Sequence, residues 1–451
     1  MKKHKTKKRL IILITILLLA FIAVGAIGFY RLPISFGGQY PERPEALATD
    51  TLLTKEQVTE DRNLAIQFVE DAHPYFIVQK DHSAYEQACR NYMNAASEAM
   101  SVGDFQAATA EYLCFFEDGH TRIRWSEDEY LDMEQVYQDQ NTYRIDNGIV
   151  SDRSVVEIGD VPIENIYKTI DHIFPAENDM ARQINRGTYI TGRNILELAG
   201  VITQEADGIA ESVTVTYSDG STEECTFYKP EEDPDSEYEP PVNTWQMDGD
   251  IFVVNFVECV DDANLKSIAD ELEKAVKQGC NKVIIDARGN GGGNSNACKR
   301  LLGAMGMKGP GYDMLIRFSD EASEQVGYLR DSGTFRWNGS AKCTVNDNVR
   351  LVVLCDRYTF SSATMLCVWV RDGKLGTIIG EASSNTPSSY GDILYMSLPN
   401  SHILATVSHK QFIRPDENNT ERALTPDIQT NPDEAYQSAV EFLSQKQPVS
   451  P

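Results

Sequence analysis

The sequence is poor in cysteine and has no metal-binding motif. Its 451 residues include nine cysteines, which are too sparse for a disulfide scaffold, and the odd number leaves at least one unpaired within a single chain. No CxxC pair and no Cys/His cluster with zinc spacing occurs. Several cysteines lie in apolar runs, as Cys355 does in LVVLC and Cys367 in MLCVWV. We therefore expect buried structural thiols and no metal site.

Positive charge is also scarce. The chain has 41 Lys and Arg against 68 Asp and Glu, a formal net charge of -27. This balance argues against a general nucleic-acid-binding role, because phosphate backbones are held mainly by clustered cations. The 41% hydrophobic and 24% charged residues fit a globular protein and argue against disorder or a many-span transporter. The length allows two to four domains.

One long apolar run stands apart from this acidic chain. Residues 10–30 carry no charge, and as a helix rising about 1.5 Å per residue they would cross a hydrocarbon core of roughly 30 Å. Residues 1–9 are basic, so we expect a cytoplasmic tail, a single membrane anchor over residues 10–30 and an extracytoplasmic remainder. The alternative is a cleaved signal peptide with its cleavage site near Ala26, which would leave the protein secreted.

The first part of the remainder reads as a stalk followed by helices. Residues 31–53 contain several Pro and Gly and little apolar periodicity, so they are predicted to be a stalk. Thr54 with Gln57, and Ser83 with Glu86, have the spacing of capping boxes, and a third helix is expected over residues 104–116. We therefore expect an N-terminal helical region over residues 54–125.

Over residues 126–230 the spacing of apolar residues shortens from a helical period to a strand period. The segment VVEIGDVPIENI, residues 155–166, is typical of a strand, a turn and a second short strand, and residues 213–228 alternate around Asp219 and Gly220 as a hairpin does. This predicts a small β-rich domain with a helical insertion. Residues 231–243, rich in Asp, Glu and Pro, are predicted to be an acidic linker.

The last predicted domain spans residues 244–446 and alternates strands with helices. Strands are expected at IFVVNF, KVIIDA, RLVVLC and LGTIIG, and helices over residues 262–278, 295–304 and 362–372. A hairpin through residues 398–400 and a closing helix opened by Asn431 and Pro432 complete it. This order predicts an α/β domain with a largely parallel sheet covered by helices.

A glycine loop, DARGNGGGN over residues 286–294, lies between a strand and a helix of this domain. Glycines let the backbone approach a ligand closely, and amides at a helix N-terminus attract negative charge. The loop matches neither phosphate-binding motif, because no Lys-Ser/Thr pair follows and GxGxxG is absent. An oxyanion hole fits the same geometry, and a tight structural turn is the alternative.

A candidate nucleophile follows the next strand. YTFSSAT places Ser361 and Ser362 between a strand and a helix, where a hydroxyl can lie beside free amides. Serine is also the commonest kind of helix N-cap, so this position alone does not establish catalysis. Its pairing with the glycine loop in one sheet favours a catalytic role.

These blocks together resemble a known family. DARGNGGG, YTFSSAT, GTIIGEASS, LPNSHI and ALTPDI, in this order, resemble the tail-specific (C-terminal-processing) serine peptidases and the core of tricorn protease. The resemblance covers roughly residues 105–430 and implies a crotonase/ClpP-like catalytic domain, with a PDZ-like domain at VVEIGDVPIENI. It also implies Ser361 as the nucleophile and an oxyanion hole made by the amides of Ser362 and of Gly291 or Gly292.

The resemblance leaves the general base to be identified. One branch of the family uses a lysine about 25 residues after the serine, and Thr386 is the nearest match here. The tricorn-like branch uses a histidine, and GHT supplies His120, whose imidazole titrates near neutral pH. The family's orienting glutamate corresponds most nearly to Glu421, one residue off the expected spacing, with Glu417 and Asp416 as alternatives.

The sequence therefore predicts a membrane-anchored extracytoplasmic serine peptidase that cleaves peptide or protein substrates. It needs no metal or organic cofactor and no nucleic acid. A noncatalytic protein that binds peptides or other ligands on the same fold is the alternative from another class. A hydrolase of nonpeptide esters would use the same serine chemistry.

Overall fold

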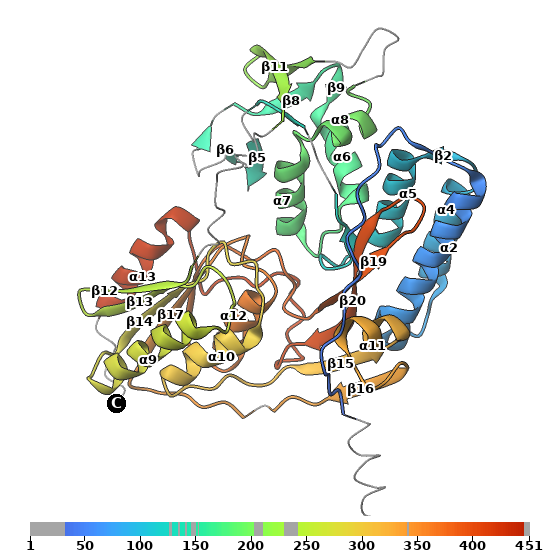
Figure 1. Cartoon of the computed structure of the whole chain (residues 1–451). Coiled ribbons are helices and arrows are strands. Elements are labelled where there is room, and N and C mark those ends of the chain that lie inside the picture. Colours follow the sequence, from blue (N-terminus) through green and yellow to red (C-terminus); the bar gives the residue numbers. More distant parts are fainter. Residues whose placement is uncertain are drawn as a thin grey trace, which may run out of the picture.

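The computed structural model describes residues 32–125, 129–133, 136–139, 142–145, 150–151, 153–202, 211–229, 242–340 and 342–445. Figure 1 shows the α/β part, the N-terminal helices and the β-rich part grouped around long strands. All nine cysteines are free, and five of them, Cys225, Cys259, Cys298, Cys355 and Cys367, are buried. For these five, the prediction of buried thiols is confirmed.

A six-stranded sheet forms the centre of the α/β part. Its strands lie in the order β12 (Thr244–Asp248), β13 (Ile251–Asn255), β14 (Lys282–Asp286), β17 (Arg350–Cys355), β18 (Gly376–Gly380) and β21 (Ile428–Gln429). Only the β12–β13 pair is antiparallel. The predicted largely parallel sheet is confirmed.

Helices cover both faces of this sheet (Figure 1). On one face lie α9 (Ala263–Lys277), α10 (Ser295–Ala304) and α12 (Ser362–Asp372), and on the other lies α13 (Ala435–Ser444), after a short 3-10 turn at Pro432–Glu434. The strands supply both cores because successive side chains alternate: Val283 and Ile285 pack with the first group, and Ile284 packs with α13. The glycine loop follows β14, and Ser361 follows β17. Because these strands are parallel neighbours, both segments lie at the carboxyl edge of the sheet.

A second, antiparallel sheet stands beside the first. Its strands lie in the order β16 (Gly333–Trp337), β15 (Asp313–Phe318), β20 (Leu404–Ile413) and β19 (Ser389–Ser397), with α11 (Asp320–Val326) between β15 and β16 in the chain. The short strand β3 (Arg122–Ile123) also pairs with β20. This pairing fixes the chain directly after His120 against the second sheet.

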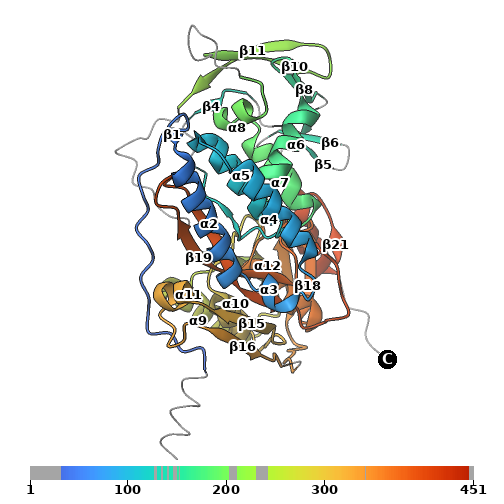
Figure 2. The ribbon, with the colours of Figure 1, turned by 90° about the vertical axis from the view of Figure 1, so that its right-hand side faces the viewer.

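The N-terminal helices pack on this second sheet. They are α2 (Lys55–Ala72), α3 (Tyr75–Val78), α4 (Ser83–Ala95) and α5 (Val102–Cys114), with β1 (Leu52–Leu53) paired to β2 (Met100–Ser101). Figure 2 shows α2, α4 and α5 together on one side of the molecule. The capping box of Thr54 is confirmed. The box predicted at Ser83 is wrong, because Ser83 is already helical and makes no side-chain cap bond, and the third helix begins at Val102 behind the cap of Ser101.

The predicted stalk lies along the folded part. Residues 32–50 are extended and largely exposed, Ser35 forms a β-bridge with Tyr328, and the Phe36 amide donates to the Gly327 carbonyl. Figure 1 shows this segment running beside β19 and β20. Within the described part of the chain no helix has the length and apolarity to span a membrane, and the predicted anchor over residues 10–30 lies outside that part.

The β-rich part holds a five-stranded sheet in the order β4 (Tyr130–Leu131), β11 (Thr222–Tyr228), β10 (Ser212–Tyr217), β8 (Val155–Ile158) and β9 (Val161–Pro162). A three-stranded sheet contains β5 (Val136–Asp139), β6 (Thr142–Ile145) and β7 (Val150–Ser151). The helices are α6 (Ile163–Ile173), α7 (Asp179–Tyr189) and α8 (Arg193–Leu198). The predicted hairpin around Gly220 is confirmed by the pairing of β10 with β11.

The second strand predicted in VVEIGDVPIENI is shorter than expected. It ends at Pro162, and α6 begins at Ile163 because Ile163, Ile166, Ile170 and Ile173 follow a helical period and are all buried on one face. Most of the predicted acidic linker, residues 231–241, lies outside the described residues.

Candidate active site

Ser361 lies at a strained turn between β17 and α12. Its backbone has φ 51° and ψ -122°, in a region that side chains other than glycine rarely adopt, and it is the N-cap residue of α12 without a side-chain cap bond. The Ser361 amide donates to Asn385 Oδ1 at 2.9 Å. The hydroxyl is therefore not used for capping and points instead toward a cleft.

His120 faces this hydroxyl although it comes 241 residues earlier in the chain. Its Nε2 lies 3.3 Å from Ser361 Oγ. The Thr406 hydroxyl on β20 donates to the His120 carbonyl at 2.7 Å, and the imidazole lies over the Phe360 ring. The structure thus brings together the two residues that the sequence predicted as nucleophile and base.

Two buried carboxylates surround the other ring nitrogen. His120 Nδ1 lies 3.5 Å from Asp118 Oδ1 and 4.0 Å from Glu177 Oε1, and both carboxylates are almost fully buried. These separations are longer than an ordinary hydrogen bond, and Nδ1 has no other partner among the described residues. The carboxylates are placed to stabilise an imidazolium once Nε2 takes up a proton.

The charges of this cluster shift its pKa values in opposite directions. Burial alone would lower the pKa of His120, but Asp118, Glu177 and Asp392 raise it overall. Burial works to raise the pKa of Asp118, but the imidazoles of His120 and His73 hold it well below its usual range. Burial and the charge of Asp118 raise the pKa of Glu177. Asp118 is therefore the permanent anion of the cluster.

Glu177 connects the base to the nucleophile. Its Oε1 accepts the Gly119 amide at 3.1 Å, and its Oε2 accepts the Asn385 side-chain amide at 2.8 Å and the Thr386 amide at 2.7 Å. Since Asn385 also accepts the Ser361 amide, one continuous set of hydrogen bonds fixes both sides of the site. Thr386, the nearest match to the family's lysine position, takes part through its backbone only.

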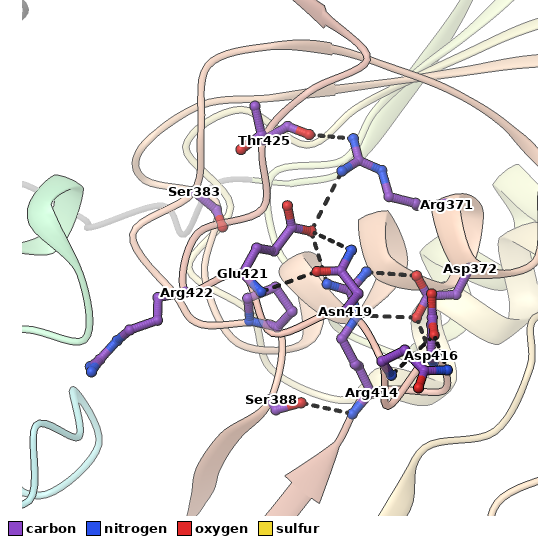
Figure 3. Close-up of polar contacts among 12 residues, drawn as sticks. Arg371, Asp372, Ser383, Ser388, Arg414, Asp416, Asn419, Glu421, Arg422 and Thr425 are labelled. Atoms are coloured by element: carbon purple, nitrogen blue, oxygen red, sulfur yellow. Dashed lines mark hydrogen bonds and ion pairs between the residues drawn. The ribbon is translucent and has the colours of Figure 1, made fainter.

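The structure does not bring Glu421 to His120. Its carboxylate lies 2.8 Å from Arg414 Nη1 and 3.5 Å from Arg371 Nη1 (Figure 3). Arg414 is almost fully buried and also pairs with Asp372 at the far end of α12, so Glu421 balances a buried guanidinium. The carboxylates beside His120 are Asp118 and Glu177, which corrects the prediction of Glu421 as the orienting residue. The alternative Asp416 accepts the amide of Asn418, two residues away, at an exposed turn.

The glycine loop packs directly against the nucleophile. Gly292 has φ 102°, and a Cβ atom added there would lie 2.6 Å from Ser361 Cβ and 2.9 Å from the Phe360 carbonyl. Its amide, however, donates to Asn290 Oδ1 at 2.9 Å, and Gly291 is exposed and outside the cleft lining. Gly293 and Ser362 line the cleft beside Ser361. The loop is where the sequence placed it, but the glycine facing the cleft is Gly293.

The cleft at Ser361 has a volume of about 380 Å³. Apolar side chains from β15, α12 and β20 line one part of it, namely Met314, Met365 and Phe412. Lys410 also lines it, but its ammonium pairs with Asp392. A larger cavity of about 790 Å³ lies between residues 40–43 and β19, and its lining contains neither a nucleophile nor a general base. The chemistry therefore belongs to the smaller cleft.

Asp118, His120 and Glu177 are also the one group in the described part of the chain with donor atoms close enough to share a metal ion, all within 4.8 Å. Their oxygens are already engaged: Asp118 accepts from Thr121, Ser408 and the His120 amide, and Glu177 accepts from three amides. We assign the group to orienting the imidazole.

Three of these residues escaped the sequence analysis. Asp118 stands two residues before His120 in EDGHT, so its spacing carried a usable signal. Asn385 directly precedes Thr386, the residue nearest to the family's lysine position. Glu177 precedes the Asn178 cap of α7 and belongs to no motif, so only the tertiary fold places it at the site.

The part of the chain that carries the glycine loop and Ser361 is similar to a known protein family. The sequence model described as Peptidase family S41 matches residues 249–430, an interval that contains the glycine loop and Ser361, while His120, Asp118 and Glu177 precede it. No curated protein matches the chain.

Several solved structures are similar to this chain. Mature CPAF is 13% identical, with a TM-score of 0.55 over 86% of this chain and 96% of that chain. Mature CPAF complexed with lactacystin is 12% identical, with a TM-score of 0.56 over 86% and 97%. The photosystem II D1 C-terminal processing protease is 15% identical, with a TM-score of 0.44 over 87% and 98%. At these identities the likeness to the CPAF structures shows a shared fold.

Proposed function

Since residues 249–430 form a domain of peptidase family S41 on a mixed α/β fold, we propose that this protein is a serine peptidase with Ser361 as nucleophile and His120 as general base. The observation that carries the proposal is the 3.3 Å separation of His120 Nε2 and Ser361 Oγ in a cleft. This separation favours catalysis over a noncatalytic binding protein, because ligand binding alone does not require the hydroxyl and the imidazole to lie within hydrogen-bonding distance.

The first step is attack of Ser361 Oγ on the peptide carbonyl carbon. The Oγ proton moves to His120 Nε2, and the new positive charge is stabilised by Asp118 and Glu177 at Nδ1. The His120 proton then passes to the leaving amine, and the resulting ester is hydrolysed by water, which His120 activates in the same way. The Ser-His pair therefore acts twice in each turnover.

The oxyanion of the tetrahedral intermediate needs donors near Ser361. Ser362, at the start of α12, and Gly293 line the same cleft, and we assign the oxyanion hole to their backbone amides. Gly292 supports it by allowing the loop to approach Ser361 closely.

The finer classification rests on the sequence resemblance. We propose a tail-specific peptidase type with a tricorn-like Ser-His arrangement, a crotonase/ClpP-like catalytic domain and a PDZ-like β-rich region. Residues 10–30 are proposed to be a single membrane anchor that leaves the catalytic part outside the cytoplasm, because they carry no charge and follow a basic tail. Partition of the full chain into membranes, and its digestion by an external protease in intact cells, test this topology.

A fluorophosphonate probe tests the chemistry directly. The full chain is expected to be labelled, and Ser361→Ala is expected to lose the label. Ser267→Ala, at an exposed position of α9, is the matched control and should be labelled at the wild-type rate. Labelling of Ser361→Ala would remove Ser361 from the mechanism. Cleavage of a peptide library by the wild type and by His120→Ala then separates a peptidase from an esterase of nonpeptide substrates.

A further inference from the structure

A second histidine lies behind the carboxylate that faces the base. His73, at the end of α2, is completely buried between the rings of Phe116 and Tyr390, with ring centroids 4.4 Å and 4.6 Å away. Its Nδ1 accepts the Tyr75 amide at 3.1 Å. An imidazole nitrogen that accepts a hydrogen bond carries no proton, so in neutral His73 the proton is on Nε2.

That protonated nitrogen faces Asp118. His73 Nε2 lies 3.5 Å from Asp118 Oδ2, while His120 Nδ1 lies 3.5 Å from Asp118 Oδ1. Asp118 is therefore held between two imidazoles, one on each oxygen. The hydroxyls of Thr121 and Ser408 also donate to Oδ2, each at 2.6 Å, so all the fixed donors other than the His120 amide gather on the oxygen that faces away from His120.

The surroundings keep His73 neutral. Burial lowers its pKa, Asp118 partly opposes this effect, and Arg317 on β15, whose guanidinium donates to the His73 carbonyl at 2.7 Å, lowers it further. The remaining titratable or charged groups that face the His73, Asp118 and His120 cluster are Tyr75, Glu177, Tyr390, Asp392 and, through Asp392, Lys410.

We propose that His73 is a positioning residue of the peptidase that acts through Asp118. Its Nε2–H, with the two hydroxyls, fixes the carboxylate so that Oδ1 points at His120 Nδ1, and it draws part of the negative charge toward Oδ2. The inference rests on the proposed function. It adds to the Ser-His pair a buried group from the N-terminal helices that never touches the substrate.

Two substitutions of similar size separate the hydrogen bond that His73 Nδ1 accepts from the Tyr75 amide from the 3.5 Å contact of Nε2 with Asp118, which is longer than an ordinary hydrogen bond. In His73→Asn the side-chain oxygen can still accept the Tyr75 amide, but no donor reaches Asp118. In His73→Gln the side-chain amide can reach Asp118. We expect loss of the Nε2–H beside the carboxylate in His73→Asn to lower kcat by about tenfold, with KM unchanged, and His73→Gln to recover most of that loss.

The pH profile distinguishes positioning from simple stability. Without the Nε2–H, more negative charge remains on Asp118 Oδ1, the pKa of His120 rises, and the acid limb of kcat/KM moves upward by about half a pH unit or more in His73→Asn. His73→Gln should keep the wild-type limb. Equal limbs in all three proteins, or equal activity loss in both variants in proportion to their melting temperatures, would overturn the proposal.

A measurement on the unmodified full chain covers the case in which the variants fail to fold. Ring ¹⁵N chemical shifts of His73 should show a protonated Nε2 and an unprotonated Nδ1 between pH 6 and 8. A charged ring, or a proton on Nδ1, would overturn the proposal. Loss of all cleavage in Ser361→Ala in the same assay confirms that the activity is that of the proposed site, so a failure of the proposed function is recognised separately.

Discussion

Alanine at position 292 would place one methyl group where the glycine loop meets the nucleophile. Gly292 has φ 102°, and the added Cβ would lie 2.6 Å from Ser361 Cβ and 2.9 Å from the Phe360 carbonyl oxygen, distances that require the loop or the Ser361 turn to move. Because the turn is already strained at Ser361, it has little freedom to relax without displacing the hydroxyl.

The cost divides into a backbone part and a contact part. A non-glycine residue at positive φ costs roughly 1–2 kcal/mol, and crowding in a packed region adds about 1–3 kcal/mol. Gly289 provides the matched control because it also has positive φ, 71°, but a Cβ added there meets nothing within 4 Å. We therefore expect Gly289→Ala to lose only about 1 kcal/mol of unfolding free energy, the backbone part.

The rate of fluorophosphonate labelling reports the position of the hydroxyl. A displacement of the order of 1 Å costs roughly 100-fold in rate, so Gly292→Ala should be labelled at least about 100-fold more slowly than Gly289→Ala under conditions in which both are folded. Denaturant unfolding of both variants gives the stability difference. Equal labelling rates would refute the view that the loop is shaped around Ser361.

Three further outcomes follow from buried charges and titratable groups inside and outside the site. Asp118→Asn should lower kcat by about 10²–10⁴-fold and move the acid limb of kcat/KM to lower pH, because the anion that raises the pKa of His120 is gone; an unmoved limb would contradict this. Glu421→Gln should leave the labelling rate within about threefold of wild type while costing about 1–2 kcal/mol of unfolding free energy. Glu177→Gln should slow labelling about tenfold, because the amide nitrogen of the new glutamine cannot accept the hydrogen bonds that Asn385 and Thr386 donate to Glu177. Burial and Lys410 lower the pKa of His409 from 6.5 to about 4. Between these pH values the unfolded chain binds more protons than the folded one, so the unfolding free energy should fall by up to about 3 kcal/mol from pH 6.5 to pH 4. Denaturant titrations should find a smaller fall in His409→Asn.

Local patterns predicted the α/β part well. The helices over residues 295–304 and 362–372 and the strands β13, β14, β17 and β18 follow from periodicity and glycine punctuation, which act within a few residues. Ser361 and His120 were found through short motifs that resemble those of a family, and the structure brings them within hydrogen-bonding distance.

Apart from Asp118, whose place two residues before His120 gives a local signal, the polar groups behind the base could not be derived in this way. Asp118, Glu177 and His73 come from a loop, a helix start and a helix end, and each is polar and buried without a periodic pattern. The family resemblance indicates Glu421, one residue off the expected spacing, but that carboxylate pairs with the buried guanidinium of Arg414. Which acid reaches the imidazole depends on tertiary packing, which local spacing does not encode.

The separation of 241 positions between His120 and Ser361 also bears on how the protein is made. Asp118 and His120 leave the ribosome first, Glu177 follows with the β-rich part, and Ser361 comes later with the α/β part. No emerging chain shorter than 361 residues contains both members of the pair. The proposed Ser-His pair therefore cannot form while the emerging chain ends before Ser361.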